Sequence, residues 1–149
     1  MALDEITENA IIGFLGEFEF EAIPWRVPFE EQYTENLDLS EFFKKYYDGL
    51  VSPGQIKLFK KVGPFDIIAM KDKKIYFFLV KKPKNNNVSF ASEEERDNFL
   101  EAKELEATVL LMTNMYPKKL FKVYEVTEKA IEGLNIKLNK AELLNLELI

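Results

Sequence analysis

Two charged residues stand out because each adjoins an otherwise apolar stretch. Asp66 is the one charged residue of the run 65–70, and Lys81 directly follows the apolar run 75–80. A carboxylate can hold a divalent metal ion, and a fixed lysine amine can orient a water molecule or stabilise developing negative charge. An unpaired charge is costly to bury, so we expect Asp66 and Lys81 to lie together.

The composition excludes most other kinds of catalytic chemistry. The 149 residues contain no cysteine and no histidine. A disulfide framework, a thiol nucleophile, an imidazole base and a zinc site built on thiolates or imidazoles are therefore absent. What remains is carboxylate–magnesium chemistry, lysine chemistry or no chemistry.

Two strands joined by a turn are expected to position Asp66 and Lys81. The turn is the polar segment 71–74, and the six apolar residues that follow it are typical of a central strand with both faces covered. Because side chains alternate along a strand, Leu79 and Lys81 should share one face with Phe77.

The remaining pattern predicts an α/β fold. We expect helices over 3–16, 92–106 and 127–134, and strands over 17–23, 55–61, 108–113 and 120–126. A strand–helix–strand order implies a crossover connection and hence a mixed sheet. Trp25, between two prolines, is interpreted as a residue that packs at the rim of the core rather than one that stacks on a base.

The chain is expected to form one domain over residues 1–149. A loop followed by a helix is inserted at about 28–54, and a Leu-rich segment occupies about 127–149. That apolar end should pack either on another subunit or on the sheet of its own chain, because an apolar end in water favours aggregation.

The segment 63–84 resembles the core motif of the PD-(D/E)XK nuclease superfamily, and most of all the archaeal Holliday junction resolvases. In that family an Asp on one strand is followed, across a hairpin, by Glu-x-Lys on the next strand. Asp66 and Lys81 match the Asp and the Lys, and Leu79 stands where the Glu should be. The resemblance implies a restriction-endonuclease-like mixed sheet with helices on both faces, and covers roughly 3–23 and 55–126.

The resemblance also implies a site and leaves its activity open. Asp66 would hold a metal, Lys81 would orient water or stabilise charge, and Glu8 would match a first-helix Glu that contributes to the family's metal site. If the missing Glu is simply lost, the chain needs no cofactor and acts as a DNA-binding or scaffold subunit. If Glu93, Glu94 or Glu95 replaces it, the chain is a divergent magnesium-dependent DNA endonuclease.

Positive charge that could bind DNA is confined to one part of the sequence. The net charge is −6, yet residues 57–84 contain nine lysines against two aspartates. If DNA binds, we expect it to follow five of these lysines: Lys60, Lys61, Lys81, Lys82 and Lys84. The overall acidity leaves a third alternative open, a protein-interaction module that does not bind DNA.

Other partners and the location follow from the same sequence. Resolvases of this type work as dimers, so the resemblance implies a homodimer or another protein partner. No run approaches the roughly 20 apolar residues of a membrane span, and the first residues lack a signal-peptide pattern. We therefore expect a cytoplasmic protein without membrane contact.

Overall fold

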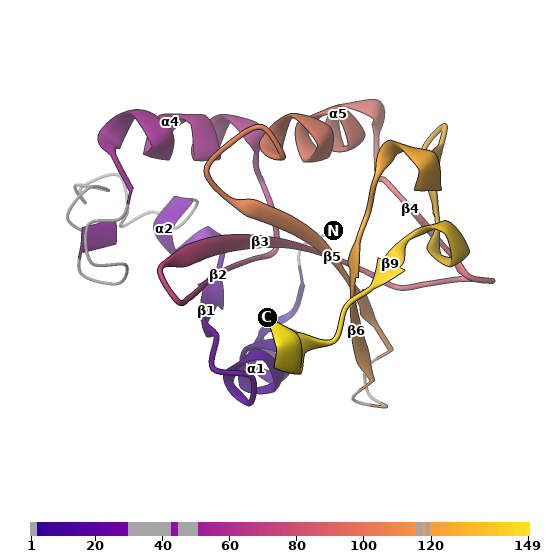
Figure 1. Cartoon of the computed structure of the whole chain (residues 1–149), viewed down its shortest axis with the longest axis horizontal. Coiled ribbons are helices and arrows are strands. Elements are labelled where there is room, and N and C mark those ends of the chain that lie inside the picture. Colours follow the sequence, from indigo (N-terminus) through magenta and orange to yellow (C-terminus); the bar gives the residue numbers. More distant parts are fainter. Residues whose placement is uncertain (1–2, 30–42, 45–50, 116–117, 119) are drawn as a thin grey trace.

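The computed structural model describes residues 3–29, 43–44, 51–115, 118 and 120–149 (Figure 1). The helix expected near residues 38–50 falls almost wholly outside these ranges. The helices are α1 (Glu5–Gly16), α2 (Arg26–Phe29), α4 (Pro53–Val62) and α5 (Glu93–Ala102). The strands are β1 (Glu21–Pro24), β2 (Ile67–Lys71), β3 (Lys74–Lys81), β4 (Asn87–Ser89), β5 (Thr108–Asn114), β6 (Phe121–Glu125), β7 (Ile131–Glu132), β8 (Asn135–Lys137) and β9 (Glu142–Leu143).

The main sheet has six strands in the order β1-β2-β3-β5-β6-β9. β3 and β5 are parallel, and the other neighbours are antiparallel. The chain reaches β5 from β3 through α5, which is the predicted crossover, so the expectation of a mixed sheet is confirmed.

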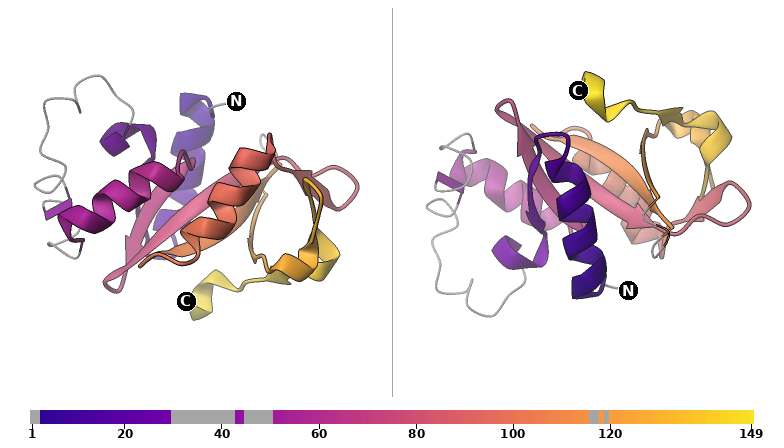
Figure 2. Two further views of the ribbon diagram at one scale, coloured as in Figure 1. Left: turned by 90° about the horizontal axis from the view of Figure 1, so that it is seen from above. Right: turned by 90° about the horizontal axis from the view of Figure 1, so that it is seen from below.

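Helices cover both faces of this sheet, as predicted. α4 and α5 lie over one face, and α1 lies over the other (Figures 1 and 2). The central strand β3 divides its side chains accordingly. Phe77 and Leu79 join the core beneath α4 and α5, whereas Phe78 and Val80 join the core against α1. The predicted alternation along this strand is therefore confirmed.

Capping residues account for where the two longest predicted helices begin. The Asp4 side chain accepts a hydrogen bond from the Thr7 backbone N–H at 2.7 Å, which caps α1. The Ser92 hydroxyl accepts one from the Glu95 N–H at 3.1 Å, which caps α5. α5 ends at Ala102, four residues before the predicted end.

The segment predicted as a strand over 55–61 is instead the helix α4. Its buried residues Ile56, Phe59 and Val62 recur every three positions, which places them on one helical face. Ser52 caps this helix through Gln55 N–H, and Pro53 occupies a position that favours a helix start. The alternation of Ile56 and Leu58 with lysines was misleading, since Leu58 is 40% exposed.

Trp25 packs in the core and not at its rim. Its side chain is 2% exposed. The indole stacks on Phe29 at 4.3 Å between ring centroids and meets Phe77 edge-on at 5.0 Å. A Cβ at Gly63 would lie 2.5 Å from the indole, so the connection from α4 to β2 passes close to this ring because it carries a glycine.

Two further predicted elements are different in the structure. Residues 17–19 form a turn after α1, with Glu19 at φ 69°, so the strand begins only at Glu21. The helix predicted over 127–134 is a short 3-10 turn, Glu128–Ala130, followed by β7. Gly133, at φ 61°, reverses the chain into β8.

The C-terminal segment folds back onto the chain's own sheet. β9 pairs with β6, and Leu146 is buried against the core on the α1 side. Leu143 and Leu148 remain 56% and 83% exposed. Of the two alternatives for this apolar end, contact with the chain's own sheet is observed. Within the described ranges, none of the helices is long and apolar enough to cross a membrane.

Candidate functional site

Asp66, immediately before β2, is held between two neighbouring segments, the strand β3 and the chain just after β1. Its backbone N–H donates to the Phe78 carbonyl at 3.1 Å, and its carbonyl accepts from Trp25 N–H at 3.0 Å. Its side-chain Oδ2 accepts from Val80 N–H at 2.7 Å. The carboxylate is therefore held against β3, the strand that carries Leu79 and Lys81.

The environment of Asp66 makes its charge unfavourable. Burial raises its pKa from 3.8 to about 6, while the Val80 hydrogen bond and the charge of Lys81 oppose the rise. The negative charge of Glu95 adds to the rise. The pKa of Asp66 thus lies closer to neutral pH than that of an ordinary aspartate, and shifts of this kind are common at functional sites.

Lys81 contacts a glutamate of α5 directly. Its Nζ lies 2.6 Å from Glu95 Oε1, which also accepts from the Ala91 backbone N–H at 3.0 Å. The Lys81 and Glu95 side chains are 20% and 26% exposed. The expected neighbour of Lys81 was Asp66. Lys81 acts on Asp66 through its charge, but its ion-pair partner is Glu95, so the site groups Asp66, Lys81 and Glu95.

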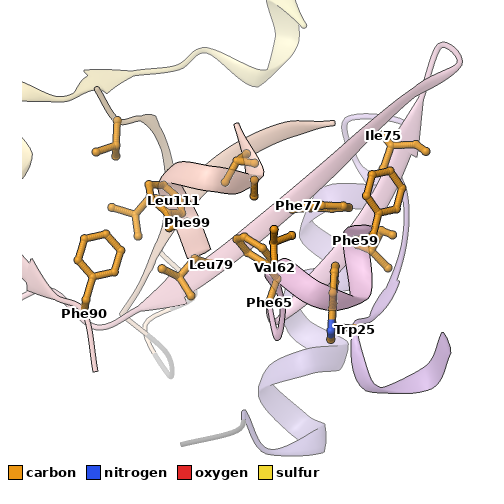
Figure 3. Packing of buried hydrophobic residues seen from close by; sticks show 14 of the residues in the cluster. Trp25, Phe59, Val62, Phe65, Ile75, Phe77, Leu79, Phe90, Phe99 and Leu111 are labelled. Atoms are coloured by element: carbon orange, nitrogen blue, oxygen red, sulfur yellow. The ribbon is translucent and has the colours of Figure 1, made fainter. Parts of the chain in front are cut away.

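Leu79 is 3% exposed and contributes apolar surface at the position where the sequence resemblance predicted a Glu. Figure 3 shows Leu79 in the core beneath the helices, in the same cluster as Val62, Phe65 and Phe99. Beside it lies a cavity of about 200 Å³. The cavity is lined by the connection Val62, Gly63, Pro64 and Phe65, by Leu79, and by Ser92, Glu94, Glu95, Asn98 and Phe99 of the α5 side.

Glu8 belongs to a different arrangement. It is buried in α1, and both its oxygens lie 3.2 Å from Arg26 Nε, with Oε1 3.0 Å from Arg26 Nη2. This two-pronged ion pair ties α1 to α2. Sequence reasoning missed Arg26, although it is one of only two arginines in the chain. Among the residues that the structure describes, no hydrogen bond or ion pair joins Glu8 to Asp66 or Lys81, so the site role of Glu8 stays a prediction.

The residues present are a poor fit to a magnesium site. Over the described ranges, no group of three or more Asp, Glu, His or Cys side chains is placed to hold a metal ion. Mg²⁺ is usually held by one or two carboxylates together with waters, so Asp66 and Glu95 are the residues that would hold it. However, Glu95 is engaged by Lys81, and Leu79 supplies no oxygen.

The predicted DNA-binding lysines lie on two elements near the cavity. Lys60 and Lys61 are exposed in the last turn of α4, just before the residues that line the cavity. Lys81 ends β3, two residues after the cavity-lining Leu79, and Lys82 and Lys84 are exposed in the segment that follows. α4 thus presents its lysines on its solvent side, although it was predicted to be a strand.

Comparison with known proteins supports the fold. No protein-family model and no curated protein sequence matches this chain. The structure is similar to that of Hjc, a Holliday junction resolvase from the archaeal hyperthermophile Archaeoglobus fulgidus. The TM-score is 0.52 over 94% of this chain and 95% of that one, at 15% sequence identity.

The chain therefore has a nuclease-like fold of the Holliday junction resolvase type. At 15% identity the likeness concerns the arrangement of helices and strands, and it carries no activity with it.

Proposed function

We propose that this chain is a nuclease-fold protein that has lost metal-dependent cleavage and serves as a DNA-binding or scaffold subunit, alone or as a dimer. Buried Leu79 is the observation that carries this proposal, because it takes the place of the second carboxylate of the PD-(D/E)XK motif. The Lys81–Glu95 ion pair supports it further, since it satisfies a carboxylate that would otherwise attract a cation.

A second candidate function is a divergent magnesium-dependent endonuclease. Glu95 favours it, because its charge acts on Asp66 and it lies next to Lys81. Asp66 and Glu95 would then hold the ion, which lowers the pKa of bound water and stabilises the leaving oxygen. Lys81 would have to move away from Glu95 and orient the attacking water.

Thermal melts with and without Mn²⁺ separate the two functions. We expect wild type to show no Mn²⁺-dependent stabilisation and no cleavage of duplex or four-way junction DNA. Leu79→Glu should lose about 2–4 kcal/mol without metal, because it buries a charge beside Asp66. Mn²⁺ should restore part of that loss by binding the folded state.

Leu79→Gln is the matched control, since it has the same shape as Glu and no charge. It should lose stability without any recovery in Mn²⁺. If Mn²⁺ already stabilises wild type, wild type cleaves DNA, and both Asp66→Asn and Glu95→Gln abolish the two effects, the endonuclease is correct and the proposed loss of cleavage is wrong.

A further inference from the structure

A second, smaller sheet lies apart from the main sheet. Its three strands run in the order β4-β8-β7, all antiparallel. Val88 and Ile136 are paired across it and are 2% and 0% exposed, so one face of this sheet belongs to the core. Since side chains alternate, the neighbouring positions point to the opposite, solvent-facing side.

The solvent-facing side carries two lateral rows of polar residues. The first row is Lys84, Asn87 and Lys137, because Asn87 pairs with both lysine positions. The second row is Ser89, Asn135 and Glu132, in which the Ser89 hydroxyl and Asn135 Oδ1 are 2.8 Å apart. Strands are spaced about 4.8 Å apart, so the Cα atoms of Lys84 and Lys137 lie roughly 10 Å apart.

Backbone hydrogen bonds fix the segment that carries the first row. Lys84 and Asn87 exchange both backbone hydrogen bonds, at 2.8 and 3.0 Å, across a turn formed by Asn85 and Asn86. These two residues have φ of 53° and 61°, which asparagine tolerates better than most residues. Leu138 N–H also donates to the Asn86 carbonyl at 2.9 Å, tying the turn to the C-terminal segment.

The charge on this side is positive. Across the part of the chain that the structure describes, no carboxylate forms an ion pair with Lys84. Lys137 and Lys140 share one carboxylate, Glu132, at 3.9 and 3.3 Å. Exposed ion pairs of this kind contribute roughly 0–1 kcal/mol, so a phosphate can compete for these lysines. Lys82 extends the positive charge from β3.

We propose that the solvent-facing side of the β4-β8-β7 sheet binds the phosphate backbone of nucleic acid. The lysines would contact phosphates, and the side-chain amides of Asn87 and Asn135 would donate to phosphate or sugar oxygens. The Ser89 hydroxyl, which donates to Asn135 Oδ1, would hold the Asn135 amide in place. These groups include no arrangement that reads one base, so binding is independent of sequence. The proposal rests on the DNA binding proposed above and adds a surface contributed by the C-terminal segment, beyond the lysines that the sequence predicts.

The place of this sheet in the fold suits the role. The turn between β3 and β4 projects at the edge of the molecule (Figures 1 and 2). It follows directly from Lys81, the last residue of β3. A nucleic acid that lies along Lys81 and Lys82 would therefore continue onto the Lys84–Lys137 row.

The salt dependence of duplex binding tests the proposal. Lys84→Ala/Lys137→Ala should lower the slope of log affinity against log salt by about 2, because each lost phosphate contact removes about 0.9. The weakening should be the same for duplexes of different sequence. Lys118→Ala/Lys122→Ala is the matched control. It removes two exposed lysines near the start of β6, outside the β4-β8-β7 sheet, and should leave the slope unchanged.

Glu132→Gln provides a variant that should gain affinity. It removes the carboxylate that competes for Lys137 and Lys140, so binding should tighten and the slope should steepen by up to about 2. All three variants change exposed or half-exposed residues, and unchanged melting temperatures would show that folding is intact.

The outcomes separate this inference from the proposed function. If wild type binds duplex DNA and the Lys84/Lys137 variant has the wild-type slope, this surface is only a solvated polar face and the inference is wrong, while DNA binding stands. If the control loses affinity equally, net charge and not this surface governs binding. If wild type does not bind DNA even at low salt, both this inference and the proposed DNA binding fail.

Discussion

Two carboxylates packed into this fold differ in how they are neutralised. Glu8 accepts three hydrogen bonds of 3.0–3.2 Å from the guanidinium of Arg26. Asp66 receives one backbone hydrogen bond, and burial raises its pKa to about 6. The difference indicates that Glu8 stabilises the junction of α1 and α2, whereas Asp66 remains a group whose charge the fold does not fully compensate.

The largest expected change in the free energy of unfolding comes from breaking the Glu8–Arg26 ion pair. Arg26→Ala should lower the free energy of unfolding by about 3 kcal/mol, because it leaves Glu8 buried without its cation. Glu8→Gln should cost only about 1 kcal/mol, since the Arg26 side chain is 39% exposed and water can solvate it. Urea unfolding measures both.

Glu5→Gln, at an exposed position of the same helix, is the control and should be nearly neutral. Equal costs for Arg26→Ala and Glu8→Gln would contradict the idea that burial of Glu8 makes this pair essential.

Asp66→Asn should raise the free energy of unfolding near neutral pH, whereas the changes at Arg26 and Glu8 lower it. The pKa of Asp66 is about 6 in the folded state against 3.8 unfolded, so the folded state binds more protons between these values. The stability of wild type should therefore fall as the pH rises from about 4 to 7, by on the order of 2–3 kcal/mol from this group.

The stability of the asparagine variant should not fall in this way, because its side chain does not ionise. Its amide oxygen can still accept the hydrogen bond from Val80 N–H. Urea unfolding at several pH values should show wild type and variant converging near pH 4 and the variant more stable near pH 8. Asp97→Asn, which removes an exposed carboxylate of α5, controls for general charge effects. A variant that is less stable at both pH values would show that Asp66 is compensated after all.

The smallest expected effect concerns the Lys81–Glu95 pair. A double-mutant cycle of Lys81→Met and Glu95→Gln should give a coupling of roughly 0.5–1 kcal/mol, because both side chains are mostly but not fully buried.

The same variants should move the titration of Asp66, followed by NMR, in opposite directions. Loss of the Lys81 charge should raise the pKa of Asp66, and loss of the Glu95 charge should lower it. Shifts of the same sign would mean that one of the two side chains does not act on Asp66 through its charge.

Sequence reasoning reached the elements whose signals are local. The apolar run of β3, the alternation of its side chains and the caps of α1 and α5 each depend on residues close together in the chain. Residues 55–61 were predicted as a strand, although the spacing of Ile56, Phe59 and Val62, with Ser52 and Pro53 before them, is a local signal for the helix α4. The error there was in the period assigned to the apolar residues.

The site was predicted in part, because only some of its signals are local. Asp66 and Lys81 follow from two apolar runs and the turn between them. Arg26 with Glu8, and Glu95 with Lys81, are separated in sequence and approach only after α1 and α5 pack on the sheet. Glu95 was named only together with Glu93 and Glu94, because the sequence gives no direction for these side chains.

The parallel pairing of β3 with β5 also has a consequence for synthesis of the chain. β3 can pair with β2 as soon as both are made, but its other edge stays open until β5 emerges, a few seconds later at typical elongation rates. During that interval an apolar strand offers unpaired backbone groups to other nascent chains. Lys73 and Lys74 at its start, and Lys81 and Lys82 at its end, are placed as gatekeepers that oppose intermolecular strand addition.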